Sequence, residues 1–327
     1  MFLFLSLHLA GCSAPAPFVV ECTGSGCGQG KGGTVAEGPS PADSAAVDSG
    51  AAEEDAPQEL QWDTGEPATG WLDIAAGGWH SCGLSADHSV LCWGRDQEGQ
   101  LDVPEGELFR SLAAGRRFTC GLGHDRMPVC WGEAPSDPPL QAFQSLAAGR
   151  DFICGIRTDS SILCWGEDGL GQLQAPSGSF HQLSVGDSHS CALDPAGSIS
   201  CWGSNGSGQC DAPAGEGFSM VSAGYFHSCA VSSGKEVECW GLDYDGSTDV
   251  PGVMAEAVWT GNYHNCVLNP DQQGLCWGGE SYGLDGGLLG SSFRGLSLGG
   301  FHTCGITSDR GLYCSGDNEQ GQTEVPE

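Results

Sequence analysis

The stretch HSCGLSADHSVLCWG, residues 80–94, holds two cysteines ten positions apart, and a Trp-Gly pair follows the second one at once. The same arrangement returns six more times before the chain ends. The first cysteines of the seven units are Cys82, Cys120, Cys154, Cys191, Cys229, Cys266 and Cys304. Their partners ten residues later are Cys92, Cys130, Cys164, Cys201, Cys239, Cys276 and Cys314. The units repeat at steps of 38, 34, 37, 38, 37 and 38 residues, the differences between successive first cysteines, and such a period indicates a repeat architecture.

Each unit contains short apolar runs separated by Gly, Pro, Asp and Ser, which is the pattern of strands and turns. The candidate strands of the first unit are WLDIAAG (71–77), HSCGL (80–84), SVLCWG (89–94) and QLDVP (100–104). Many short strands at even spacing favour a propeller with one radial sheet per repeat. We therefore expect an all-β, seven-bladed β-propeller over residues 70–327, with three to four short strands per blade. The units begin near residues 71, 109, 143, 180, 218, 255 and 293.

An open β-solenoid is the structural alternative, but it requires atypical repeats that cap its ends. The first unit here is ordinary, and the last lacks only its Trp, reading CSG at 314–316. The Trp residues of the other six Cys-Trp-Gly triplets are expected to pack between blades rather than to stack on a ligand.

The cysteine spacing fits a cross-strand staple. Pairing Cys82 with Cys92 across a hairpin places Leu84 opposite Val90, and directly opposed Cα atoms about 4.5 Å apart are within disulfide reach. A metal site would need two further ligands for each pair. The His two residues before the first cysteine cannot supply one consistently, because Phe118 and Phe152 replace it in units two and three. We predict seven disulfides within units, with reduced buried thiols as the alternative.

Composition excludes several partners. Lys and Arg total 11 against 42 acidic residues, for a formal net charge of −31, and phosphate binding requires clustered bases. The balance also argues against a purely electrostatic grip on anionic lipid. With 18 cysteines, the chain has the composition of an exported protein in an oxidising compartment.

The first twelve residues, MFLFLSLHLAGC, are an apolar run too short to span a bilayer, which needs about 20 residues. They have the form of a signal peptide, although no Lys or Arg precedes the run. The ending LAGC resembles the lipobox of bacterial lipoproteins. This resemblance implies lipidation of Cys12, and Ser13 after it is similar to outer-membrane lipoproteins. We expect a lipid anchor at the outer membrane or cell surface of a bacterium, with plain secretion as the alternative and no other membrane contact.

Residues 13–69 are rich in Gly, Ala, Ser, Pro and acid, and their only base is Lys31. Such a segment buries too little apolar surface to offset chain entropy, so we expect a disordered tether. Cys22 and Cys27 are close enough to form a local disulfide. The odd cysteine, Cys210, replaces the Leu of the Gly-Gln-Leu motif, so we expect a buried small apolar residue there.

The motifs AGGWHSCGL (76–84), VLCWG (90–94) and GQLDVP (99–104) resemble the repeats of the regulator-of-chromosome-condensation family. They look closer to a bacterial short-repeat branch that includes β-lactamase inhibitor protein II. The resemblance implies a seven-bladed propeller. For function it implies either recognition of a protein partner through loops on one face, or exchange-factor-like regulation of a small GTPase.

Catalytic motifs are not found in the sequence: there is no Gly-x-Ser-x-Gly, no His-Glu-x-x-His and no phosphate-binding loop. The stretch DYDGSTD (243–249) has the spaced carboxylates of a calcium loop, but an ordinary solvated loop is the simpler interpretation. We therefore expect that the protein is not an enzyme and uses no cofactor or metal. We also expect a monomer.

Two variable residues stand between the Ala-Gly and the His or Phe of each unit, and they occupy equivalent places in a ring. Aromatic residues and Arg, which dominate interface hot spots, are frequent among them. The predicted partner-binding residues are Trp79, Arg116, Arg117, Arg150, Asp151, Tyr225, Phe226, Tyr263 and Phe301. The alternative is that these aromatics pack beneath the loops. Asp96 and Asn205 are expected on the opposite face.

The function that follows is non-enzymatic, surface-tethered recognition of an unidentified protein. Exchange-factor-like regulation is one alternative. Binding of carbohydrate or cell wall, which shared aromatics could serve, is another.

Overall fold

The computed structural model describes residues 69–279 and 292–326 of the 327-residue chain. The signal peptide, the lipidation site Cys12, the cysteines Cys22 and Cys27 and most of the predicted tether fall outside the described residues.

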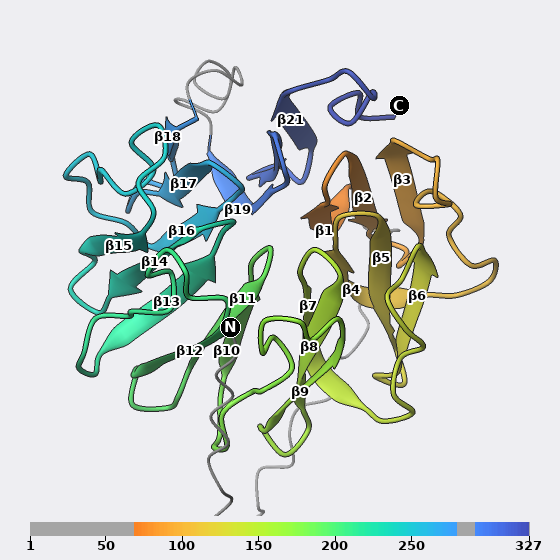
Figure 1. Cartoon of the computed structure of the whole chain (residues 1–327). Coiled ribbons are helices and arrows are strands. Elements are labelled where there is room, and N and C mark those ends of the chain that lie inside the picture. Colours follow the sequence, from red (N-terminus) through yellow and green to blue (C-terminus); the bar gives the residue numbers. More distant parts are fainter. Residues whose placement is uncertain (1–68, 280–291, 327) are drawn as a thin grey trace, which may run out of the picture. The chain divides into compact units, whose positions relative to one another are not determined.

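The described residues form seven antiparallel sheets of three strands each, in the order in which the strands occur in the chain (Figure 1). Blades 1 to 4 consist of β1 (Trp71–Ala76), β2 (His80–Ser85) and β3 (Val90–Gly94); β4 (Phe109–Ala114), β5 (Phe118–Gly123) and β6 (Pro128–Gly132); β7 (Phe143–Ala148), β8 (Phe152–Arg157) and β9 (Ile162–Gly166); β10 (Gln182–Val185), β11 (His189–Leu193) and β12 (Ile199–Gly203). Blades 5 to 7 consist of β13 (Phe218–Ala223), β14 (His227–Ser232) and β15 (Val237–Gly241); β16 (Ala257–Thr260), β17 (His264–Leu268) and β18 (Gly274–Gly278); β19 (Phe293–Leu298), β20 (His302–Thr307) and β21 (Leu312–Gly316). The propeller prediction is confirmed.

The hairpin register is the one expected from the cysteine spacing. Cys82 lies opposite Cys92 and Leu84 opposite Val90, and the Cα atoms of the cysteine pair are 4.0 Å apart. All seven pairs form disulfides within their own blades. The first cysteine of each pair is completely buried. The disulfide prediction is therefore confirmed in this structure.

The fourth strand suggested by QLDVP does not form, so each blade has three strands. Gln100 is buried in a turn, its side-chain oxygen accepting a hydrogen bond from the Glu98 amide at 2.9 Å. The next residues continue as tight turns, in which Val103 N donates to Leu101 O at 2.9 Å. The amides of Leu101, Asp102 and Val103 are thus bound within the loop rather than to β3.

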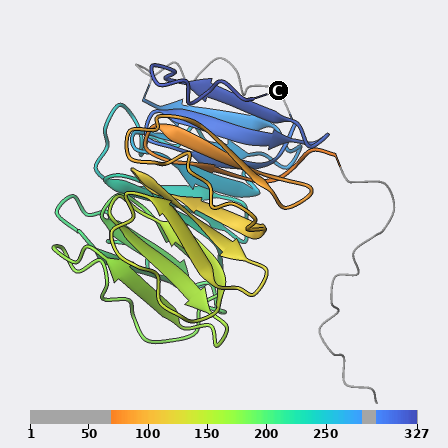
Figure 2. The ribbon, with the colours of Figure 1, turned by 90° about the vertical axis from the view of Figure 1, so that its right-hand side faces the viewer.

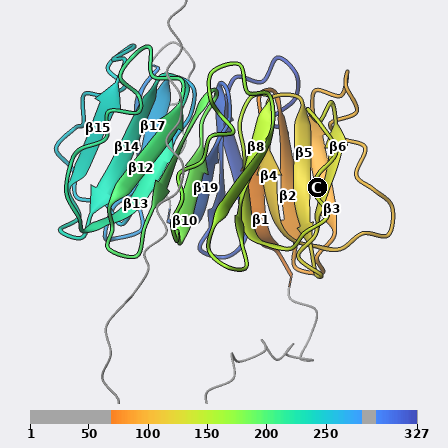
Figure 3. The same cartoon turned by 60° about the horizontal axis from the view of Figure 1, so that its bottom comes forward.

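Blade 1 packs directly against blade 7, which closes the ring (Figure 2). Trp93 of blade 1 lies in one apolar cluster with Ile306 of blade 7. The hydroxyl of Ser297 accepts a hydrogen bond from the Ala76 amide at 2.9 Å. Every blade is built from one continuous stretch of chain, so this closure depends on side-chain packing and a few hydrogen bonds. Figure 3 shows the blades standing side by side around the ring.

The Trp residues of the Cys-Trp-Gly triplets join neighbouring blades, as expected. The indole N–H of Trp131 in blade 2 donates to Gln100 O at the end of blade 1, at 2.9 Å. Equivalent bonds run from Trp93 to Gln322, from Trp202 to Gln172, from Trp240 to Gln209 and from Trp277 to Ser247. Trp165 is the exception, because blade 2 ends in the shorter loop APSDPP (134–139), which has no Gly-Gln motif.

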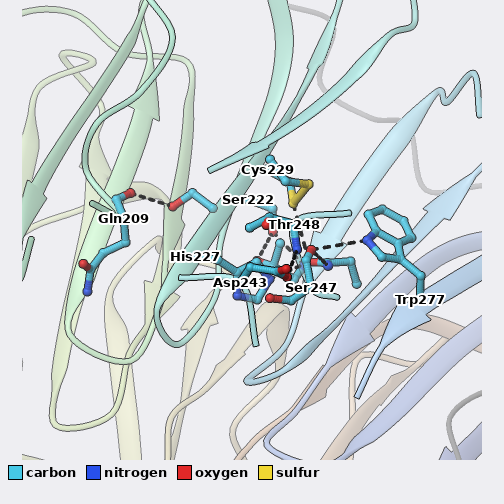
Figure 4. The surroundings of a disulfide bond; sticks show 12 residues. Gln209, Ser222, His227, Cys229, Asp243, Ser247, Thr248 and Trp277 are labelled. Atoms are coloured by element: carbon cyan, nitrogen blue, oxygen red, sulfur yellow. Dashed lines mark hydrogen bonds between the residues drawn. A yellow bond between two sulfur atoms is a disulfide. The ribbon is translucent and has the colours of Figure 1, made fainter. Parts of the chain in front are cut away.

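A polar seam runs beside this packing, and Figure 4 shows it between blades 5 and 6. His227 Nε2 is 2.7 Å from Asn265 Oδ1, and Asn265 donates to Ser247 O, the carbonyl that Trp277 also binds. Four other interfaces repeat the contact between a His and the residue before the next blade's first cysteine. These pairs are His80–Thr119, His189–Ser228, His264–Thr303 and His302–Ser81.

The His position is a packing position, as the two Phe replacements suggested. Burial lowers the pKa of His80 to about 4 and that of His264 to about 3, so both imidazoles are neutral at pH 7. Blade 2 has Phe118 there, and the residue it faces in blade 3 is the apolar Ile153. A polar pair and an apolar pair therefore occupy equivalent positions at different blade interfaces.

The two Trp environments give a matched stability test. Trp131 and Trp165 are 5 % and 8 % exposed, and each packs against a Phe of its own blade at 5.5 Å between ring centroids. Only Trp131 has a protein acceptor for its indole N–H. We expect Trp131→Phe to lower the free energy of unfolding by about 1 kcal/mol more than Trp165→Phe, because it also leaves the Gln100 carbonyl unpaired. Urea unfolding of both variants measures this, and equal losses would contradict it.

Candidate partner-binding face

The variable residue pairs gather at one end of the blades, which we call the mouth face. In blade 1 the inner strand β1 ends at Ala76 and β2 begins at His80, so Gly78 and Trp79 lie in the turn between them. The opposite end, which we call the turn face, carries the hairpin turns between second and third strands, such as residues 85–89. The repeated register places the seven pairs in equivalent turns at the same end.

The expectation that Asp96 and Asn205 lie on the opposite face is wrong. The end of β3 pairs with the start of β2, as His80 with Gly94, so the loop after β3 leaves from the mouth face. Arg95 N accordingly donates to Trp79 O at 3.0 Å. Asp96 Oδ1 holds this loop by accepting the Leu101 amide at 3.1 Å, and Asn205 does the same for Cys210.

The mouth face surrounds a central pocket of about 210 Å³. Its wall contains one glycine from each blade, Gly77, Gly115, Gly149, Gly186, Gly224, Gly261 and Gly299, and the first residue of every variable pair. Among the predicted binding residues, those that line it are Trp79, Arg116, Arg150, Tyr225, Tyr263 and Phe301. All nine predicted residues are half-buried, so part of each side chain packs and part is open to solvent.

Aromatic rings form one continuous cluster along blades 5 to 7. Tyr225 contacts Phe226 edge-on with ring centroids 4.1 Å apart, and its ring centroid is 5.6 Å from that of Tyr263. Tyr263 in turn lies 5.9 Å from Phe301 and 4.8 Å from Tyr244. The rings are tilted against one another by 31° to 85°, so the cluster presents edges and grooves rather than a flat platform.

Most arginines of the mouth face form ion pairs within that face. Arg117 pairs with Glu133 at 2.6 Å and with Asp151 at 3.6 Å, and Arg150 pairs with Asp151 at 3.2 Å. Arg116 instead stacks on Trp79, with its guanidinium carbon 5.2 Å from the ring centroid. The sequence shows that these arginines are close together, but only the structure shows which carboxylates balance them.

Three further residues belong to this face but were not predicted from the sequence. Arg95 lies over the Trp79 ring at 5.3 Å, Glu133 pairs with Arg117, and Tyr244 extends the aromatic cluster at 46 % exposure. Arg95 and Glu133 directly follow Cys-Trp-Gly, and that position binds the backbone of the variable pair in the same blade. Residues at this position could have been predicted together with the variable pairs if the direction of the loop after the third strand had been known.

The other sequence features have structural roles. Cys210 is half-buried, and burial raises the pKa of its thiol to about 11, so it is not a reactive thiolate at neutral pH. Asp243 of the DYDGSTD stretch accepts a hydrogen bond from the Thr248 amide at 3.1 Å, as Asp96 does from the Leu101 amide.

Within residues 69–279 and 292–326, no three His, Cys, Asp or Glu side chains are grouped as metal ligands. No helix in those ranges is long and apolar enough to cross a bilayer.

Five segments of the chain match a family model, that of the Regulator of chromosome condensation (RCC1) repeat, at residues 71–100, 143–172, 180–209, 221–247 and 293–322. The chain carries RCC1 repeats. The matches cover blades 1, 3, 4, 5 and 7. Each match ends at the residue whose backbone carbonyl accepts a hydrogen bond from the Trp of the next blade. No curated protein sequence matches the chain significantly.

Solved structures agree with the RCC1-repeat assignment. The CRINKLY WD40 ectodomain of the receptor kinase ACR4 from Arabidopsis thaliana is 27% identical, with a TM-score of 0.63, over 76% of this chain and 98% of that one. The ectodomain of the receptor kinase CR4 from Physcomitrella patens is 26% identical, with a TM-score of 0.65, over 74% and 72%. Prp20p from Saccharomyces cerevisiae is 16% identical, with a TM-score of 0.60, over 74% and 81%, which concerns the fold alone. An RCC1-like propeller supports a protein-binding or regulatory role.

Proposed function

We propose that this RCC1-repeat propeller is a non-enzymatic, surface-tethered protein that recognises a protein partner through its mouth face. The observation that carries the proposal is the ring of half-buried aromatic and Arg side chains around one pocket. Such residues combine a large contact area with fixed orientation, which is the composition of interface hot spots. The tilted rings suit the irregular surface of a protein better than the flat face of a sugar, which favours protein over carbohydrate.

The geometry of the chain also supports the tether. The described chain enters the ring at the turn face, where Ala86 N donates to Gly70 O and Trp71 N to Arg310 O, at 2.9 and 3.0 Å. The strand β1 then leads away from this entry point to the mouth. A propeller held through residues before 70 would thus carry its mouth at the end remote from the attachment.

Export is supported by two further observations. Seven disulfides belong to an oxidising compartment. The two plant propellers similar to this chain are ectodomains of receptor kinases. A small GTPase, the partner implied by the exchange-factor alternative, is a cytosolic protein, so these observations favour a partner outside the cytoplasm.

Site-directed photocrosslinking tests the proposal with the full-length protein. A photoreactive phenylalanine analogue at Phe226 is expected to form a specific protein adduct on intact cells. The same analogue at Tyr313, which is 38 % exposed on the third strand of blade 7, is the matched control. Adducts from position 313 and none from position 226 would place the binding surface elsewhere.

The identified partner then allows affinities to be compared. We expect Tyr225→Ala to weaken binding at least about tenfold, because truncating a buried aromatic anchor typically costs about 2 kcal/mol. Tyr313→Ala should leave the affinity unchanged. Calorimetric titration of both variants against wild type is the measurement, and unfolding midpoints show whether the fold is intact. Equal affinities of the two variants would contradict the assignment of the mouth face.

Lipid attachment is tested separately. Expressed in a bacterial host with its leader, the protein is expected to enter the membrane fraction and to incorporate labelled palmitate. Cys12→Ala should abolish both, whereas Cys22→Ala, which removes a nearby cysteine outside the lipobox, should abolish neither. Palmitate incorporation that survives Cys12→Ala would rule out the lipobox.

A further inference from the structure

Arg116 differs from the other arginines of the mouth face in its surroundings. Arg95 pairs with Glu98 at 2.6 Å, and Arg117 and Arg150 share Asp151. No described carboxylate lies within ion-pair distance of Arg116, although the chain has 42 acidic residues for 11 basic ones. Its guanidinium is held in place by the Trp79 ring, 5.2 Å away. It is a fixed, half-buried cation with its ion-pairing capacity unused.

Arg116 forms part of the wall of the central pocket, and the part of the wall next to it carries no side chains at two positions. Blades 7 and 1 contribute Gly300 and Gly78 where the other blades carry side chains. A Cβ on Gly78 would lie 2.6 Å from Arg116 O, and one on Gly300 would lie 2.7 Å from Gly78 O. Close backbone packing therefore keeps both positions free of side chains, and the pocket stays open between Trp79 and Phe301.

One acidic group already lines the pocket. Asp187 of blade 4 is half-buried and accepts a hydrogen bond from the Ser188 hydroxyl at 2.6 Å. Burial raises the pKa of its carboxyl, while the charges of Arg150 and Arg116 oppose that rise. Asp187 thus attracts these arginines at a distance without pairing with Arg116, and it would repel a second carboxylate entering the pocket.

We propose that the pocket receives one acidic side chain of the protein partner, whose carboxylate binds the guanidinium of Arg116. The inference rests on the proposed partner recognition and adds its chemistry. A planar guanidinium recognises a carboxylate through two parallel hydrogen bonds, and such charge-assisted bonds are about twice as strong as neutral ones. The pocket volume of about 210 Å³ admits a single side chain and excludes a bulky structural element. The neighbouring aromatic cluster would then pack against apolar residues flanking the inserted acid.

The test uses the full-length protein labelled with ¹⁵N-Trp, because the Trp79 ring lies against the guanidinium groups of Arg116 and Arg95, so its indole signal reports on ligand binding beside it. The probe is N-acetyl-glutamic acid amide, and its neutral counterpart is N-acetyl-glutamine amide. We expect a saturable shift of the Trp79 indole signal, assigned with Trp79→Phe, that is at least about tenfold tighter for the acid than for the amide. Equal binding of the two probes, or no binding of either, would overturn the proposal.

Three variants separate the proposed contact from general effects of charge. Arg116→Gln should weaken binding of the acid at least about tenfold. Arg110→Gln is the matched control, since Arg110 lies on β4 of the same blade at the turn face and should leave binding unchanged. Asp187→Asn should tighten binding severalfold by removing the repulsive charge. A structural role for Arg116 alone would not produce this gain, so tighter binding by Asp187→Asn supports the contact and unchanged or weaker binding contradicts it.

The source of the carboxylate is distinguished with N-acetylglycine, which offers only a terminal carboxylate. Binding as tight as that of the glutamic acid amide would overturn the assignment to a side chain. The proposal can fail while partner recognition stands, if the probes do not bind but Tyr225→Ala still weakens partner binding. Failure of the Tyr225→Ala comparison as well would remove the proposed function itself.

Discussion

Reduction of the seven disulfides is expected to unfold the propeller. Each bond closes a hairpin of about eleven residues, and a loop of that length is worth roughly 3 kcal/mol in the chain-entropy model. The seven contributions do not add fully, because the hairpin contacts are already local. Even so, a typical folded domain is stable by only about 5–15 kcal/mol in total. Three-stranded blades with a few apolar residues each have little other stabilisation to replace the lost bonds.

The measurement has two steps. Non-reducing peptide mapping of exported protein should recover Cys82–Cys92 and its six counterparts, and thermal unfolding followed by circular dichroism is then compared with and without reductant. Cys210→Ala is the control, since this half-buried thiol makes no disulfide and its loss should barely move the midpoint. Links between blades, or a reduced protein that still unfolds cooperatively near the oxidised midpoint, would show that the bonds do not hold the blades together.

Gly186→Ala is expected to destabilise the ring by about 3 kcal/mol. Gly186 belongs to the ring of glycines at the pocket, and a Cβ there would collide with Gly224 O of the next blade. The added methyl would also approach the His189 ring to 3.0 Å. Its blade cannot move away without opening the neighbouring interface, because Asp187 N is bound to the same carbonyl at 3.1 Å.

Gly295→Ala provides the comparison. Gly295 also lies on an inner strand, β19, but a Cβ there meets no atom within 4 Å. A Gly→Ala change without a clash stabilises a protein by about 0.4–1 kcal/mol through the unfolded state. Chemical unfolding of both variants under oxidising conditions should therefore move the midpoints in opposite directions. A Gly186→Ala midpoint equal to wild type would mean that the ring is looser than its backbone contacts indicate.

The local features of the blades could be predicted because local interactions determine them. A spacing of ten between Cys82 and Cys92 is compatible with one hairpin register, and alternation of apolar residues orients the same strands. Phe at positions 118 and 152, where other units have His, indicated a packing position without any coordinates. The repeat count indicated the blade number, because each unit forms one sheet.

The loops were less predictable, since their backbone can be satisfied in several ways. QLDVP has the alternation of a strand, but the buried Gln100 side chain binds the Glu98 amide in a turn, and the next three amides also bond within the loop. The wrong placement of Asp96 has a different origin. The loop after β3 leaves from the mouth face because β3 runs antiparallel to β2, so the end of β3 lies beside the start of β2.

The sequence by itself determined the seven blades, their disulfides, their hairpin register and the ring of variable pairs, because contacts within one repeat depend on residues close together in the chain. Only the tertiary structure decided how the repeats meet. Packing between blades brings Trp93 onto Gln322, balances Arg117 with Asp151 and leaves Arg116 stacked on Trp79 without a carboxylate. These contacts join residues of different blades, and their distances depend on the curvature of the whole ring, which no single repeat encodes.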